Sequence, residues 1–529
     1  MSFFGLGVSA TGLFTSQRAL ANVSHNVDNA NTPGYSRQVI NQRASQALMM
    51  TSAGMLGTGA EVISIDRVRD SFLDDKFRTQ NKFLGEYSVK STVIEAMEAV
   101  YNEPSDGGYT KILNDFYSAM QQLSTNPEEL SARALVKERG IALAKYFNNV
   151  AIRFEQEQDD LNQMVYAKVG QVNNLSDQIA KLNGQIYNIE VLGNKANDLR
   201  DQRDYLVDQL SKIVNIEAYE VETGYTLPNG DLEKRYYVTL SGKDLVSHVN
   251  SSHLTTVTRK DKLNEEDVEY LYEVQWEDGN TVNIKSGELK GYLDMRDGND
   301  GDGESPNVKG IPYYQKKMNE FVRTFAMAFN EGIIDSDGNG ILDQDTSGHA
   351  DGYGLNGSTG IRFFTMQGEE GKSLYSGEFH NGTTDIDDNI DLYSQLTAKN
   401  FRVSQDVIDD PSNNIATSNT NGEVGNNETI LSLIDMRHNT YMFMEGSGED
   451  FIKTLISSLG VDGQQMKLYN QIQTSVVKQI DNRRMSESGV SLNEEMANMI
   501  RYRQVYGASA KMIQTYNEVL DVLINGMGI

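Results

Sequence analysis

The sequence predicts a mainly α-helical fold with β insertions: terminal coiled-coil helices, a long helical-bundle shaft and one or two inserted β domains. Three observations predict it. Apolar residues recur every three or four positions at both ends of the chain and again over residues 161–189. Only seven prolines occur among 529 residues, so long helices can run without interruption. Runs of β-branched and aromatic residues between turn-forming residues are concentrated in the middle of the chain.

The last segment, residues 489–529, is predicted to be an axial helix. Ser491 and Glu494 have the spacing of a capping box, and no proline follows them. Apolar positions separated by four and three residues form a heptad seam, which needs a partner helix because an isolated apolar stripe would face water. The interface residues expected on this helix are Leu492, Met496, Met499, Tyr506, Ile513, Leu520 and Ile524.

Residues 1–35 repeat this pattern at the other end of the chain and supply the expected partner. Their seam places Leu6, Leu13, Leu20 and Val27 on one helix face. The helix is then expected to stop at the motif formed by Asn31, Thr32, Pro33, Gly34 and Tyr35, since asparagine, proline and glycine together break helices. We therefore predict that residues 1–35 pair with residues 489–529.

The segments between the two ends are predicted to form a shaft with insertions. Whether the two insertions make one domain or two stays open. The predicted order is a helical shaft at 36–215 that opens with short strands, a β insertion at 216–300, a helix rejoining the shaft at 301–334, a second Gly- and Asp-rich β insertion at 335–427, and returning shaft helices at 428–488.

Composition excludes several classes of function. The net charge of −28 disfavours a general nucleic-acid binder, since phosphates would be repelled. No apolar run approaches the length of a membrane span. The absence of cysteine excludes disulfides and thiol catalysis, and no common catalytic motif is present, so we expect no enzyme. The first residues lack the basic segment of a secretory signal, which predicts export, if any, without a cleaved signal.

One loop has the spacing of a calcium site. Oxygen ligands at alternate positions around a glycine can wrap one hard cation, although Thr346 stands where such loops carry a bidentate glutamate. The alternative is an Asp- and Gly-rich surface turn. No other cofactor is expected. The candidate ligands are Asp335, Asp337, Asn339, Ile341 and Asp343.

Five arginines fall within helical segments and are expected to lie on solvated helix faces, where ion pairs stabilise little. Contact with acidic neighbours in an assembled tube is the alternative. The five are Arg203, Arg483, Arg484, Arg501 and Arg503.

Both ends of the chain resemble the bacterial flagellar axial proteins, the family of rod, hook and hook-associated proteins. The stretch ALANVSHNVDNANTPGYSRQ is similar to the family's N-terminal signature, and SGVSLNEEMANMIRYRQVYGASAKMIQTYNEVLDVLING is similar to its C-terminal signature. Hook and rod proteins move into β structure soon after the Pro-Gly-Tyr turn. The helical character of residues 66–215 instead resembles the hook-associated members that join hook to filament.

The resemblance implies a structural role in the bacterial flagellum, at the junction between hook and filament, with self-assembly into a homo-oligomeric ring through the paired terminal helices. It implies that these helices are disordered before assembly. The implied partners are the hook protein, the second hook-associated junction protein and a cytoplasmic export chaperone on the C-terminal helix. The implied destination is the secreted flagellum, reached through the flagellar type III route. The alternatives are a hook protein, a filament subunit, or an adhesin-like surface-binding role on the β insertions.

Overall fold

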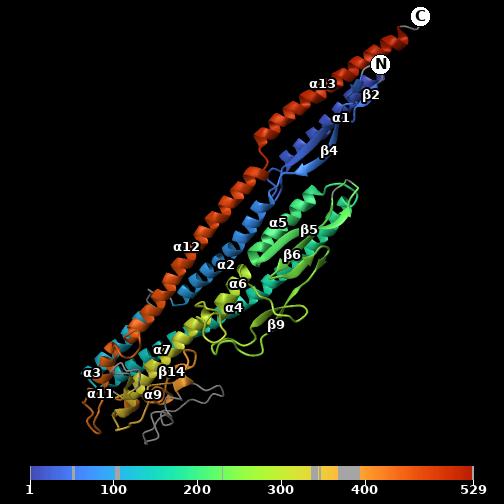
Figure 1. The fold of residues 1–529 in the computed structure, drawn as a ribbon. Coiled ribbons are helices and arrows are strands. Elements are labelled where there is room, and N and C mark those ends of the chain that lie inside the picture. The colour runs from blue at the N-terminus through green and yellow to red at the C-terminus, as the bar shows by residue number, and fades with distance from the viewer. Residues whose placement is uncertain are drawn as a thin grey trace.

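The computed structural model describes residues 2–50, 54–101, 108–228, 230, 232–334, 343–344, 347–366 and 393–526. The molecule is elongated, and its two ends lie together at one tip (Figure 1). Long helices dominate it and small sheets are attached to them, so the predicted fold class, mainly α with β insertions, is confirmed. No helix in the described part of the chain combines the length and apolarity needed to cross a membrane.

We call the tip of the molecule the terminal rod. In it the two end helices run antiparallel side by side, with Gly5 opposite Tyr516 and Gly12 opposite Ser509. Two hairpins accompany them, in which β1 pairs with β4 and β2 pairs with β3, both antiparallel. The elements of the terminal rod are α1 (Ser2–Asp28), β1 (Gln38–Ala44), β2 (Leu48–Met50), β3 (Gly54–Leu56), β4 (Ala60–Arg67) and α13 (Leu492–Asn525).

A bundle of long helices forms the shaft below the rod. Its longest member, α4, has 61 residues and spans roughly 90 Å at about 1.5 Å per residue. The seam predicted at 161–189 lies on α4, where Val165, Val172 and Ile179 are buried. The shaft helices are α2 (Ser71–Tyr101), α4 (Leu130–Glu190), α5 (Asn197–Ile213), α6 (Glu288–Asp297) and α12 (Gly448–Ser488).

The first β insertion packs against α4 and α5 and shares one core with them, which includes Val238, Leu254 and Trp276. A four-stranded sheet has the order β5-β6-β7-β8, and β9 pairs with β10. The strands end at Trp276, and α6 already returns to the shaft within the predicted 216–300 segment. The strands are β5 (Ile216–Thr226), β6 (Leu232–Leu240), β7 (Lys243–Ser247), β8 (Asn250–Ser251), β9 (Leu254–Thr258) and β10 (Tyr272–Trp276).

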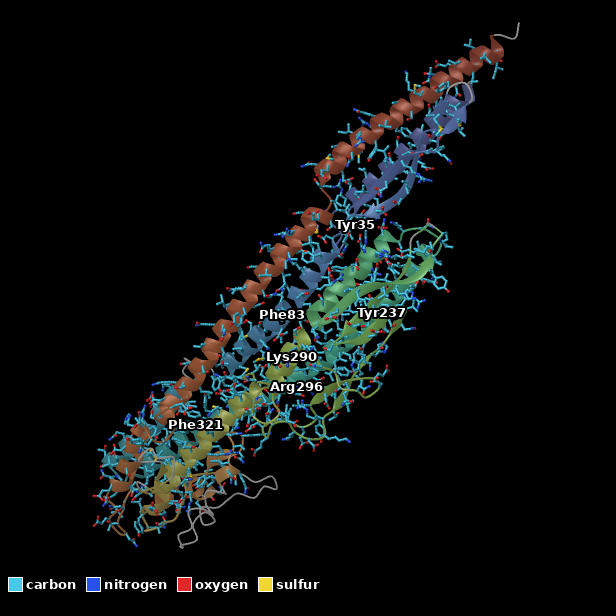
Figure 2. The ribbon with its side chains drawn as sticks, viewed as in Figure 1. Tyr35, Phe83, Tyr237, Lys290, Arg296 and Phe321 are labelled. Atoms are coloured by element: carbon cyan, nitrogen blue, oxygen red, sulfur yellow. The ribbon has the colours of Figure 1, made fainter. Side chains whose placement is uncertain are left out.

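The end of the shaft opposite the rod is an aromatic cluster that we call the distal core. Phe321 lies at its centre, parallel to Phe443 at a ring distance of 5.3 Å and stacked on Phe147 at 5.2 Å (Figure 2). The elements around it are α3 (Tyr109–Thr125), α7 (Ile311–Glu331), β11 (Ile333–Ile334), β12 (Asp343–Gln344), η1 (His349–Asp351), β13 (Phe364–Met366), β14 (Phe401–Val403), α9 (Gln405–Asp409), α10 (Pro411–Asn414), α11 (Glu428–Asp435) and η2 (Met436–His438).

The described parts of the predicted second insertion, 335–427, belong to this core. Phe363, Phe364 and Phe401 are fully buried in it, against α3, α4 and α7. The strands β13 and β14 form a two-stranded sheet of this core rather than a separate β domain. Glycine and aspartate dominate the composition of this segment, so composition did not reveal the few aromatic residues that anchor it. The burial of these aromatic rings stabilises the chain on either side of them.

Candidate assembly interface

The terminal rod leaves a large part of its apolar surface uncovered. Of the 34 residues of α13, all of them described, only Glu495 is buried. The side chains of Val522 and Ile524 are 66% and 65% exposed, and Met49 on β2 is 86% exposed. Exposed apolar side chains in this number on one part of a molecule indicate an interaction site. The other exposed apolar residues of the rod include Phe14, Leu48, Met55, Ile63, Ile500, Val505, Met512, Val519 and Leu523.

The residues predicted for the assembly interface divide between two faces. Leu6, Leu13, Leu20 and Val27 of α1 are half-buried, as are Ile513 and Leu520 of α13. The remaining predicted residues of α13 are exposed, namely Leu492, Met496, Met499, Tyr506 and Ile524. The half-buried side of α13 also carries Asn498, Tyr502, Ser509 and Tyr516. One face of α13 therefore pairs with α1, and another remains available, so the assembly role of these residues stays a prediction.

The capping box predicted at Ser491 does not form, because Glu494 is engaged elsewhere. Ser491 makes no side-chain cap hydrogen bond. Arg37 instead donates to Glu494 through Nη1 at 2.8 Å and to Glu495 through Nε at 3.0 Å. The backbone N–H of Arg37 also donates to the carbonyl of Ser488 at 2.8 Å. These bonds tie the start of α13 and the end of α12 to the strand that follows the N-terminal helix.

The motif at residues 31–35 forms a tight turn at the base of the rod. The N–H of Tyr35 donates to the carbonyl of Thr32, Pro33 occupies the second position, and Gly34 has φ +80°, the geometry of a type II turn. A Cβ on Gly34 would also come within 2.8 Å of Cβ of Tyr205. Glycine is therefore required both by the turn and by the close approach of α5.

Asparagines on α1 dock the chain that follows the turn. Asn22 and Asn26 each donate to the carbonyl of Gln38, at 2.8 and 2.9 Å, and Asn26 accepts from the N–H of Gln38. The hydroxyl of Tyr35 donates to Asn26 at 2.8 Å, and Tyr35 lies where rod and shaft meet (Figure 2). Burial, and then the charge of Asp198, raise the pKa of Tyr35, so its phenol stays a donor. The polar residues of this helix thus fix its register on β1.

A row of aspartates on α5 receives the base of the rod. We call Asp198, Asp201, Asp204 and Asp208 the acidic ladder, since their spacing of three and four residues puts them on one helix face. Asp201 accepts from the N–H and the hydroxyl of Ser36, both at 2.8 Å. The ladder was not predicted, because its partners lie far away in the sequence.

Arginines from three segments neutralise the ladder. Arg67 donates to Asp201 at 2.9 Å and to Asp204 at 2.7 Å, and Arg78 donates to Asp208 at 2.9 Å. Burial alone raises the pKa of Asp204, but the guanidinium groups of Arg203, Arg67, Arg69 and Arg78 outweigh burial and hold this pKa well below its usual range. The carboxylate of Asp204 is therefore ionised and paired.

Two of the five arginines expected on solvated faces are drawn inward instead: Arg203 is buried and Arg484 is half-buried. Arg484 of α12 donates to Asp208 at 2.6 Å and to Asp74 at 3.3 Å. The side chain of Arg203 is 4% exposed and stacks 3.6 Å from the ring centre of Tyr236. The prediction was wrong for both, since the acids that draw them inward come from other helices. Arg483, Arg501 and Arg503 are exposed, as expected.

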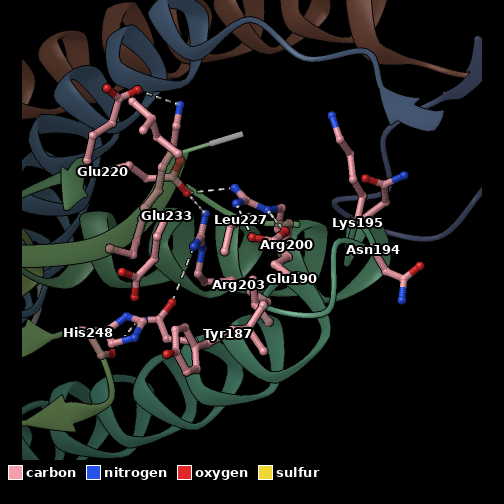
Figure 3. Close-up of a pocket in the computed structure, with 18 of the residues that line it drawn as sticks. Tyr187, Glu190, Asn194, Lys195, Arg200, Arg203, Glu220, Leu227, Glu233 and His248 are labelled. Atoms are coloured by element: carbon pink, nitrogen blue, oxygen red, sulfur yellow. Dashed lines mark hydrogen bonds and ion pairs between the residues drawn. The ribbon is translucent and has the colours of Figure 1, made fainter. Parts of the chain in front are cut away.

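A cavity of about 600 Å³ lies beside the ladder, between α4, α5 and the β5–β6 hairpin (Figure 3). Charged side chains line it, but they are paired with one another. Arg200 donates to Glu190 at 2.6 and 2.8 Å and to Glu220 at 2.7 Å, and Arg203 reaches Glu220 at 3.1 Å. These pairs attach the hairpin to the end of the shaft and leave the cavity without a surplus of either charge.

The predicted calcium loop lies outside the described residues, apart from Asp343 and Gln344, which pair with Ile334 and Ile333. Where the chain is described, no three His, Asp or Glu side chains are grouped to hold a metal ion. Calcium binding at this loop therefore stays a prediction.

Charge is distributed unevenly between the rod and the rest of the chain. Residues 1–70 and 489–529, which contain the rod, carry eight basic and eight acidic residues. The other 39 basic and 67 acidic residues account for the whole net charge of −28. Rods can therefore approach one another without net Coulomb repulsion, whereas shafts repel.

The fold and this surface define a class: an elongated, helix-built axial protein whose paired ends present an uncovered apolar face. Comparison with known proteins identifies the family. The family described as "Flagellar hook-associated protein FlgK helical domain" matches residues 94–364, and "Flagellar basal body rod FlgEFG protein C-terminal" matches residues 482–526. The chain belongs to the flagellar hook-associated protein 1 (FlgK) family.

Individual relatives support this assignment over the full length of the chain. Flagellar hook-associated protein 1 of Bacillus subtilis is 30% identical, with 100% of this chain and 99% of the relative covered. The proteins of that name from Salmonella typhimurium and Escherichia coli are each 26% identical, over 97% of this chain and 98% of theirs. The solved structure of the flagellar hook junction protein FlgK from Burkholderia pseudomallei, 14% identical, has the same fold, with a TM-score of 0.54 over 79% of this chain and 100% of that one.

Proposed function

We propose that this protein is a structural subunit of the hook–filament junction that assembles through its terminal rod. The family supports a structural flagellar role, and no catalytic step is part of the proposal. The observation that carries it is the uncovered face of α13: a helix of 34 residues with one buried residue and eleven exposed large apolar ones among its described positions. Such a helix buries its apolar area only when neighbouring subunits cover it.

Assembly adds stability that the single subunit lacks. Covering a large apolar side chain contributes about 1.5–3 kcal/mol when burial is complete. Covering several apolar residues of each rod, even by half, therefore favours association of the subunits. Because the rod carries no net charge, Coulomb repulsion between rods does not oppose this association. The two terminal helices complete their pairing in the same step, so that folding of the rod is coupled to association.

The proposed partners follow from the family and from the shape of the surface. Copies of this chain form a ring, with the hook protein on one side and the second hook-associated junction protein on the other. An export chaperone covers α13 in the cytoplasm, since a helix with this exposed apolar face is an aggregation risk before assembly. Export follows the flagellar type III route to the flagellum.

The experiment exchanges exposed apolar residues of α13 for polar ones in a strain that lacks its own copy. The variant carries Ile500→Gln, Val505→Gln and Met512→Gln, all at exposed positions. We expect normal folding and secretion into the medium but no filaments, because the surface that neighbours cover is lost. The measurements are filament counts by electron microscopy and the amount of secreted subunit.

A matched control changes exposed polar residues of the same helix: Asn493→Ala, Gln504→Ala and Gln514→Ala. This variant keeps the apolar face and should build filaments at wild-type numbers. Wild-type filaments in the apolar-to-polar variant would contradict the proposed function. A second readout is protease digestion: residues 1–30 and 495–529 should be cleaved in the free subunit and protected in flagella.

Calcium binding at the loop of residues 335–346 is proposed separately, on its ligand spacing. Calcium titrated into the full chain should raise its thermal midpoint, and the substitutions Asp335→Asn with Asp337→Asn should abolish this increase. If calcium causes no shift in the wild-type chain, the segment is an ordinary surface turn.

A further inference from the structure

The acidic ladder of α5 is placed where the rod joins the shaft. The rod is connected to the shaft by two chain crossings, at residues 67–70 and 488–491, and the turn at residues 29–37 joins α1 to β1 at the base of the rod. The two outer rungs hold different elements. Asp198 accepts from Gln38 of β1 at 2.6 Å and contacts His25 of α1 at 3.1 Å, while Asp208 accepts from Arg484 of α12 at 2.6 Å.

The two middle rungs hold the basal turn and the first crossing. Asp201 binds the backbone and the hydroxyl of Ser36 as well as Arg67, and Asp204 binds Arg67 again. Asp201 and Asp204 are 4% and 5% exposed, so water does not replace these partners. The second crossing is held by Arg37, through Ser488 and the two glutamates that open α13.

Electrostatic pairing with the acidic ladder favours a single orientation of the rod on α5. Four aspartates on one helix face repel one another, and buried carboxylates are tolerated only when cations and N–H donors reach them. Arg67 and Ser36 reach Asp201 only if the base of the rod sits in one orientation on α5. A tilted rod would leave a buried carboxylate without its partners, which is unfavourable.

We propose that the acidic ladder, with Asp201 and Asp204 as positioning residues, fixes the direction of the terminal rod relative to the shaft before assembly. The base of the rod is then ordered in the free subunit, while the parts of α1 and α13 nearer the tip stay open to protease until assembly. Pairing of α1 with α13 proceeds from Arg37 and Glu495 toward the tip. The exposed face of α13 therefore has one fixed orientation relative to the shaft when a neighbouring subunit binds it. The consequence for assembly rests on the proposed function, whereas the contacts of the acidic ladder lie within a single chain.

The test measures the direction of the rod in the soluble full-length chain. The chain has no cysteine, so two can be introduced for spin labels: Ile63→Cys on β4 and Leu468→Cys on α12, both exposed. Distances between the labels are measured by double electron–electron resonance. The wild-type background should give one narrow peak. Asp201→Asn, which keeps the shape but removes the charge, should lose that single narrow peak.

Two controls separate positioning from general instability. A label pair within the shaft, at Leu468 and at Tyr166 of α4, should keep its distribution in every variant, and the thermal midpoint of the shaft should not move. Asp159→Asn removes an exposed carboxylate of α4 and should leave both distributions narrow. Ser36→Ala, which removes one donor and no charge, should broaden the rod-to-shaft peak less than Asp201→Asn.

The outcomes discriminate between this inference and the proposed function. A narrow rod-to-shaft peak in Asp201→Asn would overturn the inference, while loss of filaments in the apolar-to-polar variant of α13 would still support the proposed function. A broadened peak together with fewer filaments supports the positioning role. A broadened peak with wild-type filament numbers would overturn the claim that rod direction governs assembly.

Discussion

The terminal rod and the distal core use apolar side chains in opposite ways. Helix α7 of the distal core buries fourteen of its 21 residues, whereas α13 of the rod buries one of 34, both helices being fully described. The core closes over its aromatic rings within one chain. The rod leaves its apolar face open and carries no net charge. The same chain therefore contains a core that is complete within one subunit and a rod whose apolar face is covered only by neighbouring subunits.

Substitution of a core ring should break the subunit itself. Phe321→Ala removes the ring around which the distal core packs and should cost about 3–5 kcal/mol of unfolding free energy. Urea unfolding followed by tyrosine fluorescence measures it. Phe14→Ala, at an exposed ring of α1, should change the same quantity by less than about 0.5 kcal/mol. Equal losses in the two variants would erase the contrast between core and rod.

A buried cation of the distal core gives the next largest effect. Arg133 is fully buried and donates to three carbonyls and a hydroxyl, and burial lowers its pKa to about 10. Arg133→Met leaves these acceptors unpaired and should cost about 3 kcal/mol. Arg139→Met, at an exposed arginine of the same helix, is the control and should lie within about 0.5 kcal/mol of wild type. The acceptors are those of Pro127, Ser412, Ile415 and Thr417.

Acid should weaken the distal core through His349. Its Nδ1 donates to the carbonyl of Ile361 at 2.7 Å and its Nε2 accepts from the N–H of Ala416 at 3.0 Å, so the folded ring is neutral. Burial lowers its pKa to about 4 from the ordinary value of 6.5. Because the folded pKa is the lower one, the unfolded chain binds more protons between these values, and stability falls as pH decreases from 6.5 toward 4.

The contribution of His349 to the loss of stability in acid can be measured by comparing the wild type with a variant that lacks this histidine. Between pH 7 and pH 5 the wild type should lose about 2 kcal/mol through this histidine. His349→Gln, which does not titrate, should lose correspondingly less over the same interval, as measured by urea unfolding at each pH. His253→Gln, at a half-exposed ring on the β insertion, should follow the wild type. Parallel pH profiles for wild type and His349→Gln would contradict the assignment.

The smallest effect on the subunit is expected on the rod. Ile500→Gln alters an exposed residue of α13 and should change the unfolding free energy by no more than about 0.5 kcal/mol. Its thermal midpoint as a free subunit should therefore match the wild type. A drop as large as that of Phe321→Ala would mean that the exposed face is already buried within the single chain.

Periodicity was sufficient to predict the long helices, because the seam at 161–189 and those at the two ends depend only on local spacing. It could not predict the acidic ladder. Asp208 meets Arg78 and Arg484, which lie 130 and 276 residues away in the sequence. Local rules likewise assigned Glu494 to a capping box, because Arg37 reaches it only after the chain has folded back along the rod.

The apolar pattern of the rod was also ambiguous by nature. Apolar residues occur on more than one side of α13, so spacing alone could not decide which side meets α1. In the structure Tyr502 and Tyr516 lie on the pairing side, whereas Met496 and Met499 face outward. The extent of the distal core was not predicted for a related reason. Phe363 and Phe401 stand among polar residues in the sequence, yet both are fully buried in the structure.

The most direct test of the central claim is the chemical accessibility of one position on α13. Val505→Cys, in a chain that otherwise lacks cysteine, is labelled with a maleimide in the free subunit and in assembled flagella, and Tyr225→Cys on the β5–β6 hairpin serves as the exposed reference. We expect rapid labelling of both cysteines in the free subunit and selective protection of Val505→Cys after assembly. Equal labelling of both cysteines in assembled flagella would contradict it.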